Sequence, residues 1–311
     1  MAILTVAQRV TIVLLTYNCE DHILDTVHRL AALNIPIIAV DNASTDNTVS
    51  LLQRFSQVEV LSLTKNIGAA ARNVGVQHAT TPYIAFCDDD TAWEIDGLQK
   101  AADMFDVYPR LGLITGRILV GQQQRLDAIS EQMADSPLPN DVHIPGSVLL
   151  SFMGGASIAR KTAWQDVGGY ERRFFIGGEE EHTAWQLAKK GWEMRYVPEV
   201  VVHHYPSNNN ADNIRHYGIR NTLWTAWLHR PLRSALAWTW HIIRSTPKNR
   251  ILLQGLIMTI PGIPWVLAHR QPFTPELEHK IQLLEQQRQK GGHKRTYGID
   301  MKSKRSHEPT S

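Results

Sequence analysis

Cysteine is scarce in this chain of 311 residues: only Cys19 and Cys87 are present, and neither stands in a CxxC motif. A disulfide-stapled scaffold, a zinc knuckle and an iron–sulfur site are therefore excluded, and a reducing compartment is compatible with the sequence. The net charge is only +2, which argues against a dedicated nucleic-acid-binding protein because neutralising phosphates requires a much more basic face. With 43% hydrophobic and 20% charged residues, the composition is that of a globular protein with one large core or two smaller ones.

Two common phosphate-binding motifs are also absent. The sequence contains no GxxxxGK[ST] and no strand-linked GxGxxG, so a phosphate-bearing ligand must be held in another way. The N-terminus lacks a basic segment followed by a long apolar run and a cleavage site, so we expect no signal peptide and a cytoplasmic location.

A third absence divides the chain. Between Asn213 and Pro275 there is no aspartate or glutamate, although this stretch contains eight arginines and lysines and five of the nine tryptophans. The change in composition predicts a first domain over residues 1–212 and a basic, Trp-rich helical region over 213–287. Residues 288–311 are basic with little apolar content, which predicts a disordered tail.

The first two hundred residues alternate apolar, β-branched runs with segments of helical period, a pattern typical of an α/β fold with a mainly parallel central sheet. The predicted strands are Val10–Leu15, Ile37–Val40, Val58–Leu63 and Tyr83–Cys87. Helices are expected to begin near Glu20, Asp46 and Gly68. Three strands run directly into polar residues, and ligands of open α/β sheets bind at such carboxyl ends.

The triple aspartate after the fourth strand is the strongest chemical signal. In an extended backbone Asp88 and Asp90 share a face while Asp89 points away. Such a pair suits Mg²⁺ or Mn²⁺, which takes one or two carboxylates and fills its other positions with phosphate oxygens and water. The alternative is a solvated acidic turn.

These residues belong to a longer series of motifs. In order, the series is TYN (Thr16–Asn18), VDNASTD (Val40–Asp46), NIGAAARNVG (Asn66–Gly75), YIAFCDDD (Tyr83–Asp90), GGASIAR (Gly154–Arg160), GGYERRFFIGGEEEHTAWQLAKKGW (Gly168–Trp192) and VPEVVVHH (Val197–His204). The series resembles inverting family-two glycosyltransferases of the GT-A fold, of the rhamnosyltransferase-like or a related bacterial polysaccharide type. The likeness covers about two-thirds of the chain and implies a GT-A domain followed by a helical C-terminal extension.

The resemblance implies a role for each matching residue near the nucleotide. Thr16, Tyr17 and Asn18 would frame the nucleobase, and Asp41 would hydrogen-bond to it. Arg72 would lie near the base or the diphosphate. Asp46 is ambiguous, and a structural role as a helix cap is favoured.

Within the DxD motif, the resemblance directs Asp88 at the ribose and the metal and Asp90 at the metal, and we count Asp89 among the nucleotide-binding residues. Some family members use a histidine after the next strand as a further metal ligand. His203 and His204 both qualify, but strand alternation places them on opposite faces, and His204 matches the family's histidine. The implied cofactor is Mg²⁺ or Mn²⁺.

The resemblance also implies a general base in an ED-type motif that opens a helix. Glu180 stands at this position, with Ala184, Leu187 and Ala188 on the same helical face. Glu179 and Glu181 are the alternatives. The helix N-terminus and a nearby cation are expected to favour the ionised carboxylate. Three acids at a helix start are also explained by the helix dipole alone, and the preceding pair of glycines suits either close approach to a ligand or a plain turn.

The implied reaction is metal-dependent transfer, with inversion, of a sugar from a nucleotide diphosphate sugar to an acceptor hydroxyl. We expect a UDP or dTDP sugar as donor, a glycan or lipid-linked acceptor, and a place in cell-envelope or extracellular polysaccharide synthesis. A non-catalytic nucleotide-sugar-binding protein of the same fold is the main alternative. A haloacid-dehalogenase phosphatase also has DxD after a strand, but its motif requires Thr or Val where this chain has Ala92.

Two further segments bear on the acceptor and the membrane. Leu119–Ser147 lacks steady periodicity, which predicts a mobile loop beside the acceptor cleft. Ile251–Ala268 is apolar but is interrupted by Pro261 and Pro264, so a core hairpin or an interfacial segment is favoured over a spanning helix. The surrounding tryptophan and arginine suit the inner face of the cytoplasmic membrane, and the alternative is a helical subdomain with solvated arginines.

Overall fold

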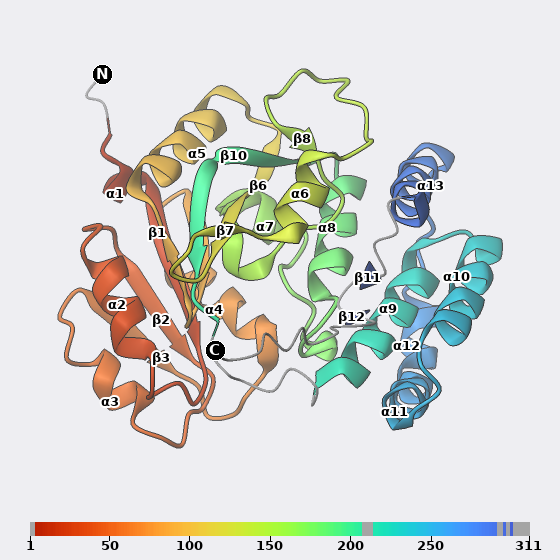
Figure 1. Cartoon of the computed structure of the whole chain (residues 1–311), viewed down its shortest axis with the longest axis horizontal. Coiled ribbons are helices and arrows are strands. Elements are labelled where there is room, and N and C mark those ends of the chain that lie inside the picture. Colours follow the sequence, from red (N-terminus) through yellow and green to blue (C-terminus); the bar gives the residue numbers. More distant parts are fainter. Residues whose placement is uncertain (1–3, 207–213, 291–294, 297–298, 301–311) are drawn as a thin grey trace, which may run out of the picture. The chain divides into compact units, whose positions relative to one another are not determined.

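The computed structural model describes residues 4–206, 214–290, 295–296 and 299–300. The chain forms two compact units, coloured by sequence in Figure 1. Unit 1 comprises Met1–Phe175 and Glu179–Asn209, and unit 2 comprises Ile176–Gly178 and Asn210–Ser311.

Unit 1 is built on one mixed sheet with the strand order β3-β2-β1-β4-β9-β6-β10-β5, to which β7 and β8 add at β6 and β10. The strands are β1 (Val10–Thr16), β2 (Ile37–Asp41), β3 (Val58–Ser62), β4 (Tyr83–Asp88), β5 (Thr91–Trp93), β6 (Leu111–Val120), β7 (Arg125–Leu126), β8 (Ser147–Val148), β9 (Ser157–Arg160) and β10 (Glu193–His204). Its α-helices are α1 (Val6–Arg9), α2 (Ile23–Ala31), α3 (Thr48–Leu52), α4 (Arg72–His78), α5 (Ile95–Val107), α6 (Ala128–Ala134), α7 (Lys161–Asp166) and α8 (Glu179–Lys189). The 3-10 turns are η1 (Gly68–Ala71), η2 (Gly154–Ala156) and η3 (Arg172–Phe174).

The four predicted strands are confirmed as β1 to β4, and they pair in parallel. Their apolar residues alternate between two covered faces of the sheet. Ile12 and Leu14 of β1 join the core with α2 and α5, whereas Val13 faces α4, where a side chain at Gly75 would collide with it. Because both faces are covered, the strands read as continuous apolar runs.

The registers of the parallel strands bring the polar residues at their ends together. Thr16 stands opposite Asp41, and Leu15 stands opposite Asp88. The second half of the sheet is mixed, because β9 runs antiparallel between β4 and β6, and β5 runs antiparallel to β10. In this pairing His204, the last residue of β10, lies opposite Thr91, directly after the triple aspartate.

The segment Leu119–Ser147, predicted to be an irregular loop, contains regular structure. Strand β6 continues to Val120, β7 pairs with it, and α6 follows. Asp127 caps α6 by accepting a hydrogen bond from the Ile129 amide, and Ser130 and Met133 are buried. The prediction of irregular structure was wrong because α6 has only two turns, too few for its apolar period to show in the sequence.

Unit 2 contains the helices α9 (Arg215–His229), α10 (Leu232–Ser245), α11 (Arg250–Thr259), α12 (Ile263–Ala268) and α13 (Pro275–Lys290), a 3-10 turn η5 (Ile260–Gly262), and the strands β11 (Arg295–Thr296) and β12 (Ile299–Asp300). Helices α10, α11 and α12 each contact α9, and a small core joins Ile219 and Leu223 of α9 to Ile242 of α10 and Leu252 of α11. The tail predicted to be disordered lies largely outside the described residues.

Candidate active site

The carboxyl ends of β1 and β2 form one wall of the site. Asp41 is buried, and hydrogen bonds fix both of its carboxylate oxygens. Oδ1 accepts hydrogen bonds from the hydroxyls of Thr16 and Ser44, and Oδ2 accepts one from the Ser44 amide. The side chain of Asn18 links the two strand ends by accepting a hydrogen bond from the Thr45 amide at 2.8 Å. Tyr17 is 46% exposed between them, so its ring is available to stack on a flat ligand.

Asp46, by contrast, has a structural role. Its Oδ1 accepts a hydrogen bond from the Thr48 amide at the start of α3, and its Oδ2 accepts one from the Glu20 amide. The carboxylate therefore ties two loops of the wall together.

The end of β4 places Asp88 beside Arg72, the first residue of α4. The Arg72 guanidinium is buried and donates a hydrogen bond to Asp88 Oδ1. Burial raises the pKa of Asp88, and the positive charge of Arg72 opposes that rise. The carboxylate also lies directly over Gly155, where an added Cβ would come within 2.2 Å of Asp88 Oδ2. A glycine at this position is what allows the carboxylate to sit there.

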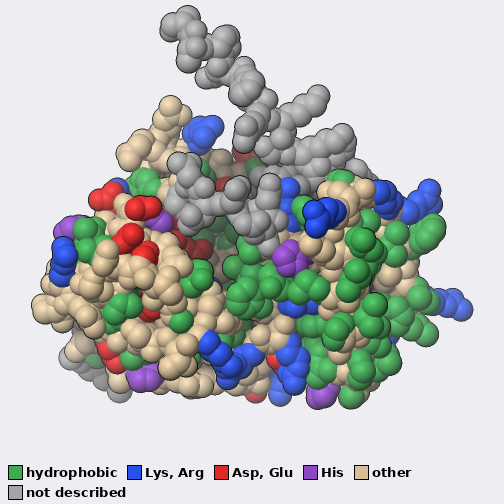
Figure 2. Space-filling view, turned by 90° about the horizontal axis from the view of Figure 1, so that it is seen from below, with side chains coloured by type: hydrophobic (Ala, Val, Ile, Leu, Met, Phe, Trp, Pro, Cys, Tyr) green, Lys and Arg blue, Asp and Glu red, His purple; other side chains and the backbone are tan. Residues whose placement is uncertain are grey.

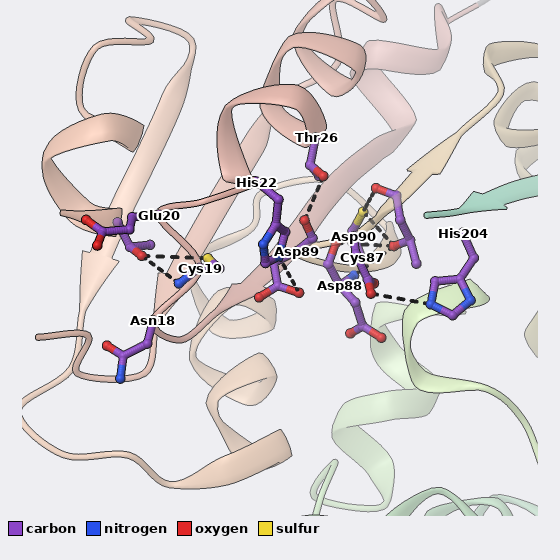
Figure 3. Close-up of polar contacts among 12 residues, drawn as sticks. Asn18, Cys19, Glu20, His22, Thr26, Cys87, Asp88, Asp89, Asp90 and His204 are labelled. Carbon is purple, nitrogen blue, oxygen red and sulfur yellow. Dashed lines mark hydrogen bonds and ion pairs between the residues drawn. The ribbon is translucent and has the colours of Figure 1, made fainter. Parts of the chain in front are cut away.

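Asp89 lies apart from its two neighbours, although not by strand alternation: β4 ends at Asp88, and Asp89 and Asp90 belong to the turn that follows. Figure 3 shows its side chain directed toward His22, with Oδ1 at 3.6 Å from His22 Nε2. Its carbonyl oxygen accepts a hydrogen bond from the Thr26 hydroxyl of α2, and the Asp89 carboxylate raises the pKa of His22. Its side chain thus faces α2 and the loop before it.

Asp90 and His204 face one another at the ends of β4 and β10. Asp90 Oδ2 lies 3.4 Å from His204 Nε2 (Figure 3). The Asp90 carboxylate raises the pKa of His204 against the opposing effect of burial. His203 points elsewhere, with Nε2 2.8 Å from Glu94 Oε1 and Nδ1 against Gln124.

The donor set at this position suits a divalent cation that keeps open coordination positions. Asp90 would supply a carboxylate oxygen and His204 an imidazole nitrogen, ligands that Mn²⁺ accepts alongside phosphate oxygens. Asp88 is engaged by Arg72 instead. Within the described residues no cluster of three or more His, Cys, Asp or Glu side chains could hold a metal ion.

Glu180 is the second residue of α8, and its carboxylate interacts electrostatically with Arg72 and Asp88. A Cβ added to Gly154 would lie 3.3 Å from Glu180 Oε1, so the carboxylate sits closely over this glycine of η2. Burial raises the pKa of Glu180; backbone amides and Arg72 oppose the rise, and Asp88 adds to it. The backbone amide of Glu180 at the start of α8 and the charge of Arg72 favour the ionised form, as expected, but the effect of burial on the pKa is larger. A raised pKa brings a carboxylate nearer to the range of an effective general base.

Tyr170 is a site residue that the sequence reasoning missed. Its ring is fully buried against Trp164 and Phe152, and a Cβ on Gly154 would lie 3.1 Å from its hydroxyl oxygen, beside Glu180. That hydroxyl is buried without a hydrogen-bond partner among the described residues. The signal in the sequence was the choice of tyrosine at a buried position where phenylalanine would fill the same space.

Two asparagines within the motifs position the site, and these were also missed. Asn73 of α4 donates a hydrogen bond to the Tyr170 carbonyl and accepts hydrogen bonds from the Tyr170 amide and the Trp164 indole. Asn42 donates to the Gly68 carbonyl and accepts from the Ile67 amide. Both asparagines hold loop backbone that carries site residues.

Gly68 makes the closest backbone contact of this region. Its φ is +65°, and an added Cβ would lie 1.9 Å from the Phe175 carbonyl oxygen, which accepts a hydrogen bond from the Ala69 amide at 2.7 Å. Phe175 itself has φ +62°, an uncommon value for a bulky residue. This contact joins η1 to the segment before α8. Arg72 directly follows η1, and α8 begins with the three glutamates.

The glycine pair before α8 forms a turn. Gly177 and Gly178 have φ of +84° and +88°, and within unit 2 the Asn221 side-chain amide donates hydrogen bonds to the carbonyls of Ile176 and Gly177. The plain-turn interpretation is therefore supported.

A cavity of about 450 Å³ in unit 1 lies between α4 and α8 and is lined in part by Asn73, Tyr170 and His182. None of the sequence-predicted site residues lines it. The acidic cluster at the strand ends, and not this cavity, is the centre of the predicted chemistry.

The mixed sheet, with acidic and basic side chains at the ends of β1, β2, β4 and β10, is the arrangement expected of the GT-A fold. The Glycosyl transferase family 2 model matches residues 11–168, just over half of the chain. The chain belongs to glycosyl transferase family 2.

Two curated relatives illustrate the match in sequence. The teichuronic acid biosynthesis glycosyltransferase TuaG of Bacillus subtilis (strain 168) is 32% identical over 147 residues, which cover 45% of this chain and 54% of the relative. The poly-beta-1,6-N-acetyl-D-glucosamine synthase of Staphylococcus aureus (strain MSSA476) is 26% identical over 200 residues, 61% of this chain and 48% of the relative. The chain thus spans about half the length of these relatives.

Solved structures support the fold. GalNAc-T7, crystallised with UDP, GalNAc and Mn²⁺, has a TM-score of 0.58 and 12% identity, covering 84% of this chain and 56% of that one. The mannosyltransferase PcManGT from Pyrobaculum calidifontis, in complex with GDP-Man and Mn²⁺, has a TM-score of 0.51 and 18% identity, covering 93% of this chain and 88% of that one. The predicted GT-A fold is confirmed.

Proposed function

We propose that this protein transfers a sugar, with inversion, from a UDP or dTDP sugar to an acceptor hydroxyl. The observation that carries the proposal is the convergence of three elements on one site: β4 with Asp88 and Asp90, β10 with His204, and the start of α8 with Glu180. These carboxylates and the histidine lie beside the ends of β1 and β2, where the nucleobase is proposed to bind. The arrangement suits binding of a nucleotide diphosphate and transfer of one proton.

The donor is proposed to lie along the strand ends. Tyr17 and Asn18 border the nucleobase, Asp41 accepts a hydrogen bond from it, and Thr16 keeps Asp41 in position. Arg72 holds the Asp88 carboxylate in place, and Asp88 is proposed to contact the ribose. The position of Asp89 against His22 supports a role in ordering the loop after β1 more than direct contact with the nucleotide.

Asp90 and His204 are proposed to hold Mg²⁺ or Mn²⁺. When bound, the cation neutralises negative charge on the departing diphosphate. Two ligands from the chain leave positions for diphosphate oxygens, so cation and donor are expected to bind together.

Glu180 is proposed as the general base. The acceptor oxygen attacks the anomeric carbon from the face opposite the nucleotide, its proton passes to the Glu180 carboxylate, and the bond between the anomeric carbon and the diphosphate oxygen breaks. The nucleotide diphosphate leaves with the electron pair, and one displacement inverts the configuration. The buried Tyr170 hydroxyl beside Glu180 is available to donate a hydrogen bond to a substrate oxygen or to the carboxylate.

The acceptor is proposed to be a glycan or a lipid-linked glycan in bacterial polysaccharide synthesis, at the cytoplasmic face of the membrane. The names of the curated relatives support the polysaccharide. The non-catalytic alternative shares the nucleotide site but does not require Glu180.

The stereochemical course tests this function. The full chain is incubated with Mn²⁺ and candidate UDP and dTDP sugars, and the anomeric configuration of the product, or of the sugar released to water, is followed by NMR. We expect the configuration opposite to that of the donor. A retained configuration would contradict the single displacement, and a complete lack of turnover with every donor that binds would favour the non-catalytic alternative.

A further inference from the structure

Eight of the 14 exposed large hydrophobic side chains among the described residues lie in unit 2. On α10 the exposed residues Leu232, Leu236 and Trp240 follow each other at four-residue spacing, and residues four apart lie on one side of a helix. Leu236 is 52% exposed and Trp240 is 60% exposed. The buried residues Ala235 and Ile242 lie on a different side of the helix, so this stripe is not part of the core.

A second stripe runs along α11, η5 and α12. Leu253, Ile257 and Ile260 repeat at spacings of four and three, and Ile263 and Leu267 continue the stripe; all five are between 43% and 61% exposed. We call the two stripes together the apolar face of unit 2. Figure 2 shows hydrophobic side chains gathered over the C-terminal helices, with lysine and arginine nearby.

Positive charge borders the apolar face. Arg233 and Arg244 lie on α10, Lys248 precedes α11 and Arg250 is the first residue of α11; all four are exposed. None of the four forms an ion pair with an acidic side chain in the described part of the chain, and the sequence from 213 to 275 contains no acid. By comparison, Arg230 is buried and pairs with Glu278 and Glu285 of α13. The exposed cations are therefore available to an anionic partner.

The segment under the second stripe is anchored on its other side. The described residues contain one helix long and apolar enough to cross a membrane, Arg250–Ala268, and only 17% of its apolar window is buried. Its glycines are the contact points: a Cβ on Gly255 would lie 2.7 Å from the Ile219 Cβ, and a Cβ on Gly262 would lie 2.1 Å from the Trp224 ring. Because one side is fixed to α9, lipid cannot surround this segment unless α9 also enters the bilayer.

Helix α9 is unsuited to the bilayer interior. It carries buried polar and charged side chains, among them Arg220, Asn221 and His229, and placing a charge at the centre of a bilayer is costly. A helical element with one apolar side, one polar side and flanking cations lies in the plane of the membrane–water interface. Tryptophan side chains also favour this interface.

We propose that the apolar face of unit 2 binds in the plane of an anionic lipid bilayer, with the stripes of α10 and α11–α12 among the acyl chains and Arg233, Arg244, Lys248 and Arg250 against the headgroups. The proposal specifies the membrane contact of the proposed function, but its evidence lies in unit 2 alone. A second copy of the chain is a poorer partner, because two such faces would bring like charges together.

Flotation of the full chain with lipid vesicles tests the proposal. We expect the protein to float with phosphatidylcholine vesicles that contain phosphatidylglycerol and to remain largely in the soluble fraction with phosphatidylcholine alone. Raising the salt concentration is expected to weaken binding several-fold, because salt screens the attraction between arginine and lipid.

Matched variants separate this face from general surface effects. Ile257→Glu places a charge in the second stripe at a 56% exposed position, and Val107→Glu makes the same change at a 66% exposed position on α5 of unit 1. We expect Ile257→Glu to weaken vesicle binding by about tenfold or more, and Val107→Glu to leave it unchanged. Arg233→Glu with Arg244→Glu is expected to weaken binding by about fivefold for each arginine, whereas Arg54→Glu with Lys100→Glu on unit 1 has little effect.

Three results would overturn the proposal. Equal flotation of Ile257→Glu, Val107→Glu and the native chain would place the contact elsewhere. Retention in vesicles after an alkaline carbonate wash would indicate a spanning helix. Absence of flotation together with a concentration-dependent dimer that Ile257→Glu dissociates would assign the face to a second copy. Vesicle binding is measured without donor, so it stands or falls separately from nucleotide binding and transfer.

Discussion

Glu180 differs from Glu179 and Glu181 in where its carboxylate lies. Its Oε1 sits over Gly154, close to the Tyr170 hydroxyl, and Arg72 and Asp88 act on its charge. Glu179 and Glu181 are buried, at 4% and 3% exposure. The partial exposure of Glu180 and its place at Gly154 support the proposal that it is the base.

Glu180→Gln keeps the size of the side chain but removes the proton acceptor. We expect turnover to fall by about 10²–10⁴-fold, while the dissociation constant of the nucleotide changes by less than about twofold because the nucleotide does not bind through this group. Initial rates and calorimetry measure the two effects. Glu179→Gln is the matched variant, and loss of turnover in Glu179→Gln with normal turnover in Glu180→Gln would transfer the role to Glu179.

The neighbouring histidines provide a test of the cation site with its own control. His204→Ala removes the imidazole that faces Asp90, so Mn²⁺-dependent nucleotide affinity is expected to fall at least about tenfold. His203→Ala removes a ring that pairs with Glu94 and Gln124, and it is expected to leave that affinity within about twofold of native. Manganese titration in the presence of nucleotide measures both. Equal effects of the two variants would remove His204 from the cation site.

The elements of the first half of unit 1 are predictable because local signals agree there. Each of β1 to β4 is an apolar run that ends in polar residues, so both the strands and the edge where Thr16, Asp41, Asp88 and Asp90 meet follow from the sequence. The insertion of β9 between β4 and β6 depends on pairing between residues more than seventy positions apart, which no local pattern encodes.

The contact between Gly68 and Phe175 illustrates the same limit. A glycine in NIGAAAR is visible in the sequence, but the carbonyl that it must approach lies more than one hundred residues later. The roles of Asn42 and Asn73 are hidden for the same reason, since their hydrogen bonds reach backbone groups of other loops. Positioning residues of this kind require the folded structure.

Gly68→Ala tests whether this contact positions the site. The new Cβ meets the Phe175 carbonyl oxygen, so α4 and the segment before α8 must move apart, and the free energy of unfolding and kcat/KM should both fall. Gly168→Ala is the control, because Gly168 has φ +75° but nothing within 4 Å of an added Cβ. We expect Gly168→Ala to lower the free energy of unfolding by about 1–2 kcal/mol because of its positive φ alone. Gly68→Ala is expected to lower it by at least about twice as much. If the two variants lowered the free energy of unfolding in urea equally, the close contact at Gly68 would not contribute to stability.

Helix α8 also makes stability depend on pH. His182 is buried beside Phe174, with ring centroids 4.6 Å apart, and burial, with a smaller effect of Lys189, lowers its pKa to about 4. Below the ordinary histidine pKa of about 6.5, the unfolded chain binds a proton that the folded chain does not. Stability should therefore decrease as the pH falls from about 6.5 to 4, by up to about 3 kcal/mol.

Urea unfolding of the native chain and of His182→Gln at several pH values measures this effect. The glutamine cannot take up the proton, so its stability should fall less than that of the native chain over the same range. Parallel losses in the two proteins would show that other groups cause the pH dependence.

On the scale of the whole molecule, chemistry and surface are divided between the two units. Unit 1 contains the acidic and basic side chains of the proposed transfer, and unit 2 contains the exposed apolar and cationic face. The sequence predicted this division in part, because the acid-free stretch begins near residue 213. It left open whether the apolar segment is a core hairpin or an exposed interfacial segment, since an apolar run in a helix has the same pattern whether it faces a core or a lipid surface.

The central claim is that unit 1 binds a nucleotide diphosphate together with a divalent cation at the ends of β4 and β10. Calorimetric binding of UDP, dTDP, GDP and CMP to the full chain, each with and without Mn²⁺, tests it most directly, with Asp90→Ala as the matched variant. We expect UDP or dTDP to bind tightly only with Mn²⁺, and Asp90→Ala to abolish the dependence on metal. Absence of binding by every nucleotide, or binding unaffected by both Mn²⁺ and Asp90→Ala, would contradict it.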